Sequence, residues 1–266
     1  MDNRPIGIFD SGIGGLTILQ KLLEKLPDEE YIYVADQKNF PYGKKSKEEL
    51  VALTSRIAQF LVGRDAKLIV VACNTATCHA LAELRKLFAV PIVGVVPAIK
   101  PAALRTKTGN IGLIATPATL ESTYVDELIA THASGVKVWK IGCLGLENIV
   151  ERGGWNEKEI AALLSEHTSV FKENNIDKLV LGCTHYPFLR KEIGAIFGPD
   201  IEIIDSGEAV AEQVKNILRE KNLNHAPDKV STDASVEFFT TGDADVFSRT
   251  ASRLLGYEIR TTHLSL

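Results

Sequence analysis

Short apolar segments alternate with segments of helical periodicity along most of the chain, and this alternation limits the fold most strongly. The first apolar segments, which we expect to form buried strands, are IGIFD at 6–10, YIYVAD at 31–36, LIVVA at 68–72 and PIVGVV at 91–96. Helical spacing of apolar residues predicts helices between them, over 16–26, 47–63 and 76–88. Strands that alternate with helices form a parallel sheet with both faces covered. The sequence therefore predicts an α/β fold.

The same pattern restarts after residue 97. NIGLIATPATLES at 110–122 has the outline of PIGIFDSGIGGLT at 5–17, with a strand that begins Ile-Gly, a polar turn and a helix. LVLGCTHYPFL at 179–189 has the outline of IVVACNTATCHAL at 69–81. The Ile-Gly strands are 105 residues apart and the cysteines are 110 residues apart. The repeat indicates an internal duplication of an α/β unit.

The repeat predicts how the chain is divided. We expect two similar α/β units with parallel or mixed sheets, related by a pseudo-two-fold axis, with the active site in the cleft between them. The first unit would cover residues 1–97 and the second residues 98–206. Residues 207–266 hold a helical stretch, the strand-like VEFFTTGD and a further helix. This segment is short for an independent domain, so we expect it to pack onto the first unit.

Composition excludes several classes of function. The chain has 266 residues, 45% of them apolar and 24% charged, as in ordinary globular proteins. Its net charge of −4 argues against a nucleic-acid partner. The N-terminal MDNRPIGIFDSG does not read as a signal peptide, and no apolar run approaches the ~20 residues that cross a bilayer. We therefore expect a cytoplasmic protein without a membrane partner.

The four cysteines are Cys73, Cys78, Cys143 and Cys183. In a reducing compartment they are not expected to form disulfides. Their spacing does not match a zinc site, so we predict no metal. Cys78 and Cys143 lack a partner motif, and we interpret both as structural residues.

Polar residues follow the predicted strands at the edge where parallel sheets bind ligands. They are Asp10-Ser11, Cys73-Asn74-Thr75, Thr116 with Thr119, and Cys183-Thr184-His185. Each of the two cysteines precedes a helix, whose N-terminal N–H groups and partial positive charge are expected to lower the thiol pKa. The turns hold no Arg or Lys, so hydroxyls, an amide and backbone N–H groups would bind an anion.

Two facing thiols suit one reaction well. A thiolate can remove a proton from a carbon atom while a thiol donates one to its opposite face, which inverts the carbon. Asp10 and His185 would then assist proton transfer at the nearest cysteine, and Asp10 could pair with a substrate ammonium group. A single cysteine at a strand end is more often part of the core. What favours chemistry here is the parallel placement of Cys73 and Cys183.

The glycine-rich DSGIGG at 10–15 leaves a second interpretation open. A phosphate-binding loop of the type G-x-G-x-x-G would need a glycine at position 17, where this chain has Thr17. The nucleotide interpretation is therefore the weaker one.

Several segments resemble the glutamate racemases of the aspartate/glutamate racemase superfamily. These segments are FDSGIGGLT, YVADQKNFPYGKKS, VACNTATCHAL, GVVPAIKPA, LIATPATLES, VLGCTHYPFL and IIDSGEA. They occur in this order from residue 6 to about residue 210. Each segment alone is a weak indication of the family, but all of them together, in this order, are specific to it.

The resemblance implies a cofactor-independent enzyme that interconverts L- and D-glutamate and supplies D-glutamate for peptidoglycan, and so for cell-wall biogenesis and cell shape. It implies that Cys73 and Cys183 are the acid/base thiols, assisted by Asp10 and His185 respectively. The implied substrate contacts are Asp10, Ser11, Tyr42, Gly43, Asn74, Thr75, Thr116, Thr119, Thr184 and His185. Glu151 is a further candidate, as an acid that lines the cleft.

The resemblance also implies partners. Members of the family are usually homodimers. A peptidoglycan-precursor nucleotide is a candidate activator, because some branches respond to one and GVVPAIKPAA at 94–103 is closer to that kind.

Two other functions remain open from the residues alone. One is another reaction of the same superfamily, a decarboxylation or a cis–trans isomerisation of a diacid. The other is a binding protein that holds a small molecule between two lobes without chemistry. A racemase should incorporate deuterium at the substrate Cα, whereas a binding protein should keep its affinity when a cysteine is replaced.

Overall fold

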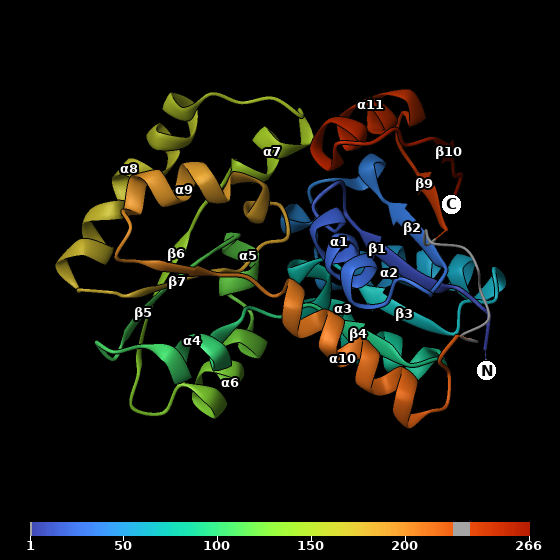
Figure 1. Ribbon diagram of the computed structural model, residues 1–266, viewed down its shortest axis with the longest axis horizontal. Helices are drawn as coiled ribbons and strands as arrows, with labels where there is room; N and C mark the ends of the chain where they lie inside the picture. The colour runs from blue at the N-terminus through green and yellow to red at the C-terminus, as the bar shows by residue number, and fades with distance from the viewer. Residues whose placement is uncertain (1, 226–234) are drawn as a thin grey trace.

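The computed structural model describes residues 2–225 and 235–266, and for residues 166–168 it describes the backbone only. Within this part of the chain, the strands form two separate sheets that lie in two lobes (Figure 1). Every strand pairing in both sheets is parallel. The predicted α/β class is confirmed, and the alternative of mixed sheets is wrong.

The first sheet has the strand order β10-β9-β2-β1-β3-β4. Its strands are β1 (Ile6–Asp10), β2 (Tyr31–Ala35), β3 (Leu68–Val71), β4 (Ile92–Gly94), β9 (Val236–Thr240) and β10 (Thr261–His263). The second sheet has the order β6-β5-β7-β8. Its strands are β5 (Asn110–Ala115), β6 (Lys137–Gly142), β7 (Lys178–Leu181) and β8 (Glu202–Ile204). The second order repeats β2-β1-β3-β4, as the sequence repeat predicts.

Helices connect the strands and cover both sheets. Those of the first part are α1 (Leu16–Lys25), α2 (Lys47–Gly63), α3 (Asn74–Leu87) and α4 (Ile99–Arg105), with the 3₁₀ turns η1 (Gln37–Asn39) and η2 (Tyr42–Lys44). The following ones are α5 (Pro117–Leu120), α6 (Thr123–His132), α7 (Leu146–Glu151), α8 (Glu157–Glu173), η3 (Tyr186–Leu189), α9 (Arg190–Phe197), α10 (Gly207–Glu220) and α11 (Ala244–Leu255).

Local chemistry explains where the best-predicted helices begin. Ser46 and Glu49 form a reciprocal capping box at the start of α2, which begins and ends where the sequence predicts. Helix α3 begins at Asn74, two residues earlier than predicted. Cys73 is its N-cap residue, and the Cys73 carbonyl accepts a hydrogen bond from the Thr77 N–H. The first turn of α3 therefore follows directly on the cysteine.

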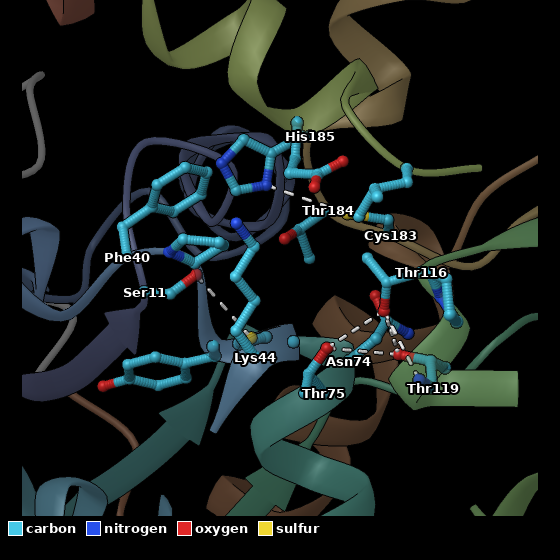
Figure 2. A pocket seen from close by; sticks show the side chains of 17 residues that line it. Ser11, Phe40, Lys44, Asn74, Thr75, Thr116, Thr119, Cys183, Thr184 and His185 are labelled. Carbon is cyan, nitrogen blue, oxygen red and sulfur yellow. Dashed lines mark hydrogen bonds between the residues drawn. The ribbon is translucent and has the colours of Figure 1, made fainter. Parts of the chain in front are cut away.

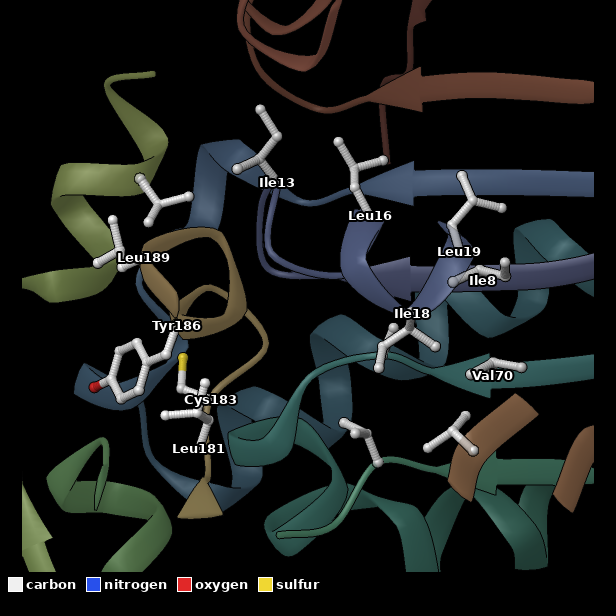
Figure 3. Packing of buried hydrophobic residues seen from close by; sticks show 14 of the residues in the cluster. Ile8, Ile13, Leu16, Ile18, Leu19, Val70, Leu181, Cys183, Tyr186 and Leu189 are labelled. Carbon is white, nitrogen blue, oxygen red and sulfur yellow. The ribbon is translucent and has the colours of Figure 1, made fainter. Parts of the chain in front are cut away.

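One apolar cluster runs from the first unit into the second. Ile8 and Val70 of the first sheet pack with Leu19 of α1, and the same cluster continues to Leu181 and Tyr186 near the end of β7 (Figure 3). A separate cluster fills the opposite face of the first sheet, under α2 and α3. The shared cluster holds the ends of β1 and β7 close together, and the candidate site lies there.

The C-terminal segment adds to the first sheet. β9 pairs with β2, β10 pairs with β9, and α10 packs against α1. Both chain ends lie on this lobe in Figure 1. Of this segment, 226–234 lies outside the described residues. The division into 1–97 with 207–266, and 98–206, remains our proposal for the domains.

Phe247 of α11 tests how the C-terminal segment is attached. Its side chain is fully buried and its ring stacks on Tyr33 of β2, with 6.2 Å between centroids. We expect Phe247→Ala to lower the free energy of unfolding by about 3–5 kcal/mol, because it leaves a cavity between α11 and the sheet. Urea unfolding followed by circular dichroism measures this change.

Val246→Ala is the matched control, because Val246 is the neighbouring residue on the same helix and is 44% exposed. It should change the free energy of unfolding by no more than about 0.5 kcal/mol. Similar effects of the two substitutions would contradict the proposed packing.

Candidate active site

The two cysteines singled out in the sequence line one cavity between the units. Cys73 follows β3, and Cys183 lies two residues after the end of β7. Both are buried, and both line a cavity of about 260 Å³ (Figure 2). The parallel strands bring the two thiols to the same opening, as the repeat predicts.

Most other predicted site residues line the same cavity. They are Ser11, Tyr42, Gly43, Asn74, Thr75, Thr116, Thr119, Thr184 and His185. Asp10 and Glu151 do not line it. Each lies behind a residue that does, and each is connected to one cysteine through that residue.

Asp10 lies behind Ser11 on the Cys73 side. The Ser11 hydroxyl is 4.0 Å from the Cys73 Sγ and donates a hydrogen bond of 2.9 Å to Asp10 Oδ1. Asp10 also accepts from the Gly12 N–H at 3.0 Å and from the Thr184 hydroxyl of the second unit at 2.8 Å. Burial raises the Asp10 pKa, and nearby His185 and these hydrogen bonds oppose the increase. Asp10 is thus a buried link between the two cysteine loops.

Glu151 lies behind His185 on the Cys183 side. His185 Nδ1 is 3.8 Å from the Cys183 Sγ, and its Nε2 is 2.8 Å from Glu151 Oε1. Glu151 also accepts from the Ile13 N–H at 2.5 Å and from Gln37 Nε2 at 2.9 Å. Glu151 therefore orients the imidazole and joins α7 to the first unit.

The pKa of His185 is raised well above its usual range. Burial by itself would lower it, but hydrogen bonds to Cys183 and Glu151, with the charges of Cys183 and Asp10, outweigh burial. An imidazolium can donate from both nitrogens, which fits a sulfur on one side and a carboxylate on the other.

The expected lowering of the Cys73 pKa is wrong. Burial raises it well above its ordinary value, and the Asp10 carboxylate adds to the increase. The hydrogen bond from the Ala76 N–H at the start of α3 lowers it, but does not compensate. After Cys183 the chain forms the 3₁₀ turn η3 and then α9, so no α-helix begins directly at this cysteine.

Three threonine hydroxyls gather at one part of the cavity. Thr75 Oγ1 lies 3.2 Å from both Thr116 Oγ1 and Thr119 Oγ1, which are 2.9 Å apart. Asn74 lies beside them, and its buried Nδ2 has no hydrogen-bond partner among the described residues. This wall offers neutral donors without a formal charge, which suits a carboxylate.

Tyr42 lines the cavity, and its hydroxyl has a hydrogen-bond partner that does not. The hydroxyl donates a hydrogen bond of 2.7 Å to Asp36 Oδ2, away from the cavity. Burial raises the Tyr42 pKa well above its ordinary value, and the charge of Asp36 adds to this.

The glycines of DSGIGG serve close packing between the units. A Cβ on Gly14 would lie 2.3 Å from His185 Nδ1, and a Cβ on Gly12 would lie 1.9 Å from Glu151 Oε1. The backbone of this loop is therefore the surface against which His185 and Glu151 rest. This contact accounts for two glycines without a phosphate ligand.

Sequence reasoning missed several residues that line the cavity. They are Phe40, Pro41, Lys44, Pro117, Leu144 and Glu147. Lys44 directly follows the predicted Tyr42-Gly43 pair. Glu147 lies one helical turn before Glu151 on α7, so it takes the place in the cavity wall that was predicted for Glu151.

Among the side chains that the structure describes, no cluster of three or more His, Cys, Asp or Glu residues is placed to hold a metal ion. No helix in the described part of the chain is long and apolar enough to cross a membrane.

Known proteins resemble this chain closely. The family model for Asp/Glu/hydantoin racemases matches residues 6–214. A curated glutamate racemase from Roseiflexus sp. is 44% identical over 252 residues, which cover 94% of this chain and 92% of the relative.

Two solved structures extend the similarity to the fold. A glutamate racemase isoform from Bacillus anthracis superposes with a TM-score of 0.86 at 33% identity, covering 100% of this chain and 99% of that one. Escherichia coli glutamate racemase, in complex with L-glutamate and the activator UDP-MurNAc-Ala, has a TM-score of 0.83 at 35% identity, with coverages of 98% and 97%.

The pairing of His185 with Glu151 predicts a measurable titration. We expect Glu151→Gln to lower the His185 pKa, because it removes a charged acceptor from the imidazolium. Since the folded-state pKa is raised, His185 contributes stability that is fully present below its unfolded pKa of about 6.5 and is lost as pH rises through the folded value. NMR titration of the imidazole resonances measures the change.

The imidazole resonances of the exposed His263 serve as an internal reference for comparing the two proteins. An unchanged His185 titration in Glu151→Gln would contradict the assigned pairing.

Proposed function

The chain belongs to the Asp/Glu/hydantoin racemase family, and from this membership we propose that it interconverts L- and D-glutamate by cofactor-independent proton transfer between two cysteines. The curated relatives identify it as an isomerase of the amino-acid racemase type. The proposed two-cysteine mechanism goes beyond what membership of the family establishes. It depends on one observation, which is that Cys73 and Cys183 line the same cavity.

The two thiols have different partners, and this difference suits opposite roles. Cys73 has a raised pKa beside the Ser11–Asp10 pair, so it is protonated and can donate. Cys183 lies against His185, whose raised pKa keeps a cation near the sulfur. In one direction the Cys183 thiolate removes the Cα proton, and the Cys73 thiol protonates the opposite face of the carbanion. The reverse reaction exchanges the two roles.

The remaining residues fit a substrate with carboxylates. The Asn74 amide and the hydroxyls of Thr75, Thr116 and Thr119 are neutral donors on one wall. Hydrogen bonds from such donors to a carboxylate stabilise charge where the carbanion delocalises. We propose that Ser11, Tyr42, Gly43, Thr184 and His185 complete the substrate contacts. In this scheme Asp10 and Glu151 act through Ser11 and His185 and do not touch substrate.

Glutamate is favoured over aspartate by the relatives, which are glutamate racemases over most of the chain. We further propose that the product D-glutamate serves peptidoglycan synthesis in the cytoplasm, and that the protein is a homodimer. The Escherichia coli structure contains the activator UDP-MurNAc-Ala, and a related peptidoglycan precursor is our candidate activator for this chain.

Solvent exchange tests the reaction directly. Incubation with L-glutamate in D2O should give D-glutamate that carries deuterium at Cα, without added pyridoxal phosphate or metal. Proton NMR and circular dichroism follow exchange and inversion. Exchange with aspartate but not with glutamate would refute the substrate assignment, and exchange with neither would refute the racemase mechanism.

Replacement of either cysteine tests the two-base mechanism. We expect Cys73→Ser and Cys183→Ser each to lower the rate of racemisation by at least ~100-fold, because a serine hydroxyl is a far weaker acid than a thiol and does not ionise to act as a base. Circular dichroism measures the rate from both enantiomers. Cys78→Ser is the matched control, since Cys78 is a free thiol outside the cavity, and it should leave the rate nearly unchanged.

If one cysteine variant keeps near-normal turnover, the mechanism uses a single thiol. If both bind glutamate normally and the wild type shows no turnover, the chain is a binding protein.

A further inference from the structure

Glu147 is a buried carboxylate that the proposed mechanism leaves without a role. It belongs to the first turn of α7, is 4% exposed, and is the only Asp or Glu among the described side chains that line the cavity. Its Oε2 accepts a hydrogen bond of 3.1 Å from the Gly145 N–H. Within the described chain, no other donor bonds it and no Lys, Arg or His forms an ion pair with it.

A buried carboxylate without a counter-charge is costly. Glutamate side chains are rarely buried unless they are paired, because burial removes the water that stabilises their charge. Glu147 has one backbone donor, and it faces a space that a ligand can fill. A cationic group of the ligand would supply the missing partner.

Asp10 is not available for this task. Among the described residues, the hydrogen bonds that reach its carboxylate come from Ser11, Gly12 and Thr184, and the side chain is fully buried and does not line the cavity. The earlier expectation that Asp10 pairs with a substrate ammonium group does not fit this position. Glu147 has the right charge and lies in the wall itself.

The charges around the cavity are arranged for an amino acid. Neutral donors from Asn74 and the three threonines come from the starts of α3 and α5, whereas Glu147 belongs to a different helix, α7. Lys44 is the only Lys or Arg among the described lining residues. In Figure 2 its side chain extends toward His185 and away from Thr75 and Thr119. A carboxylate is thus favoured at the threonines, and an ammonium group at Glu147.

We propose that Glu147 binds the α-ammonium group of the substrate and selects amino acids over diacids that lack an amino group. This inference rests on the proposed function and adds a specificity determinant to it. A carboxylate in the wall attracts the ammonium group of glutamate, whereas glutarate has no cationic group to pair with it. It therefore favours glutamate over glutarate, which has the same carbon chain and no amino group.

The test compares glutamate with glutarate in wild type and in Glu147→Gln. We expect Glu147→Gln to raise KM for L- and D-glutamate by about tenfold or more, since a charged hydrogen bond is lost. The inhibition constant of glutarate should stay the same or fall, because a negative charge leaves the wall. Circular dichroism gives KM and kcat, and competition gives the inhibition constant.

Glu127→Gln is the control, because Glu127 is exposed on α6 of the same unit, and it should change neither constant. An unchanged KM in Glu147→Gln would overturn the proposal. So would an equal rise in KM and in the glutarate constant, since that pattern indicates a distorted cavity.

Lys44→Met tests whether the cationic partner of Glu147 is the ligand or the Lys44 side chain. It should weaken glutamate and glutarate alike, because both carry two carboxylates. If it instead reproduces the pattern of Glu147→Gln, the partner of Glu147 is Lys44 and the proposal is wrong.

The role of Glu147 can be tested even if the proposed racemase function is wrong. If wild type does not racemise glutamate, calorimetric titration of wild type and Glu147→Gln with L-glutamate and with glutarate still measures selection for the ammonium group. Loss of that selection in Glu147→Gln supports the role of Glu147, and its persistence overturns it.

Discussion

The hydrogen bond from the Thr184 hydroxyl to Asp10 Oδ2 joins the two halves of the site, and the arrangement of the cavity depends on it. Asp10 ends β1 of the first unit, and Thr184 follows Cys183 of the second. A fully buried carboxylate needs hydrogen-bond donors, so separation of the loops would leave Asp10 with fewer of them. The Thr17 hydroxyl reinforces the junction through a bond of 3.0 Å to the Thr184 carbonyl. The two thiols are thereby kept at one opening.

Similar topology has produced two unlike chemical environments. The strand order around β3 repeats around β7, and each of the two cysteines follows its strand. Cys73 adjoins a serine that bonds a carboxylate, whereas Cys183 adjoins an imidazole with a raised pKa. An exact symmetry would give both sulfurs the same protonation state. The two units differ in the residues that lie next to each sulfur.

Much of this could be predicted from the sequence because it depends on periodicity and on parallel topology. Those features give the α/β class, the repeat, and the position of Cys73 and Cys183 at one edge. The pKa of Cys73 could not be predicted, because burial outweighs the helix start and burial depends on tertiary packing. Glu147 and Glu151 differ by one helical turn, and only the packing of α7 shows that Glu147 faces the cavity.

Side chains of the second unit pack directly against the glycine loop that follows β1. Gly12 and Gly14 leave room for Glu151 and His185, which belong to the other half of the chain. A side chain as small as alanine at either position would occupy space that a proton-handling group now fills. A substitution in this loop of the first unit would therefore displace side chains of the second unit, which lie more than a hundred positions away in the sequence. At this contact the two units cannot be redesigned one at a time.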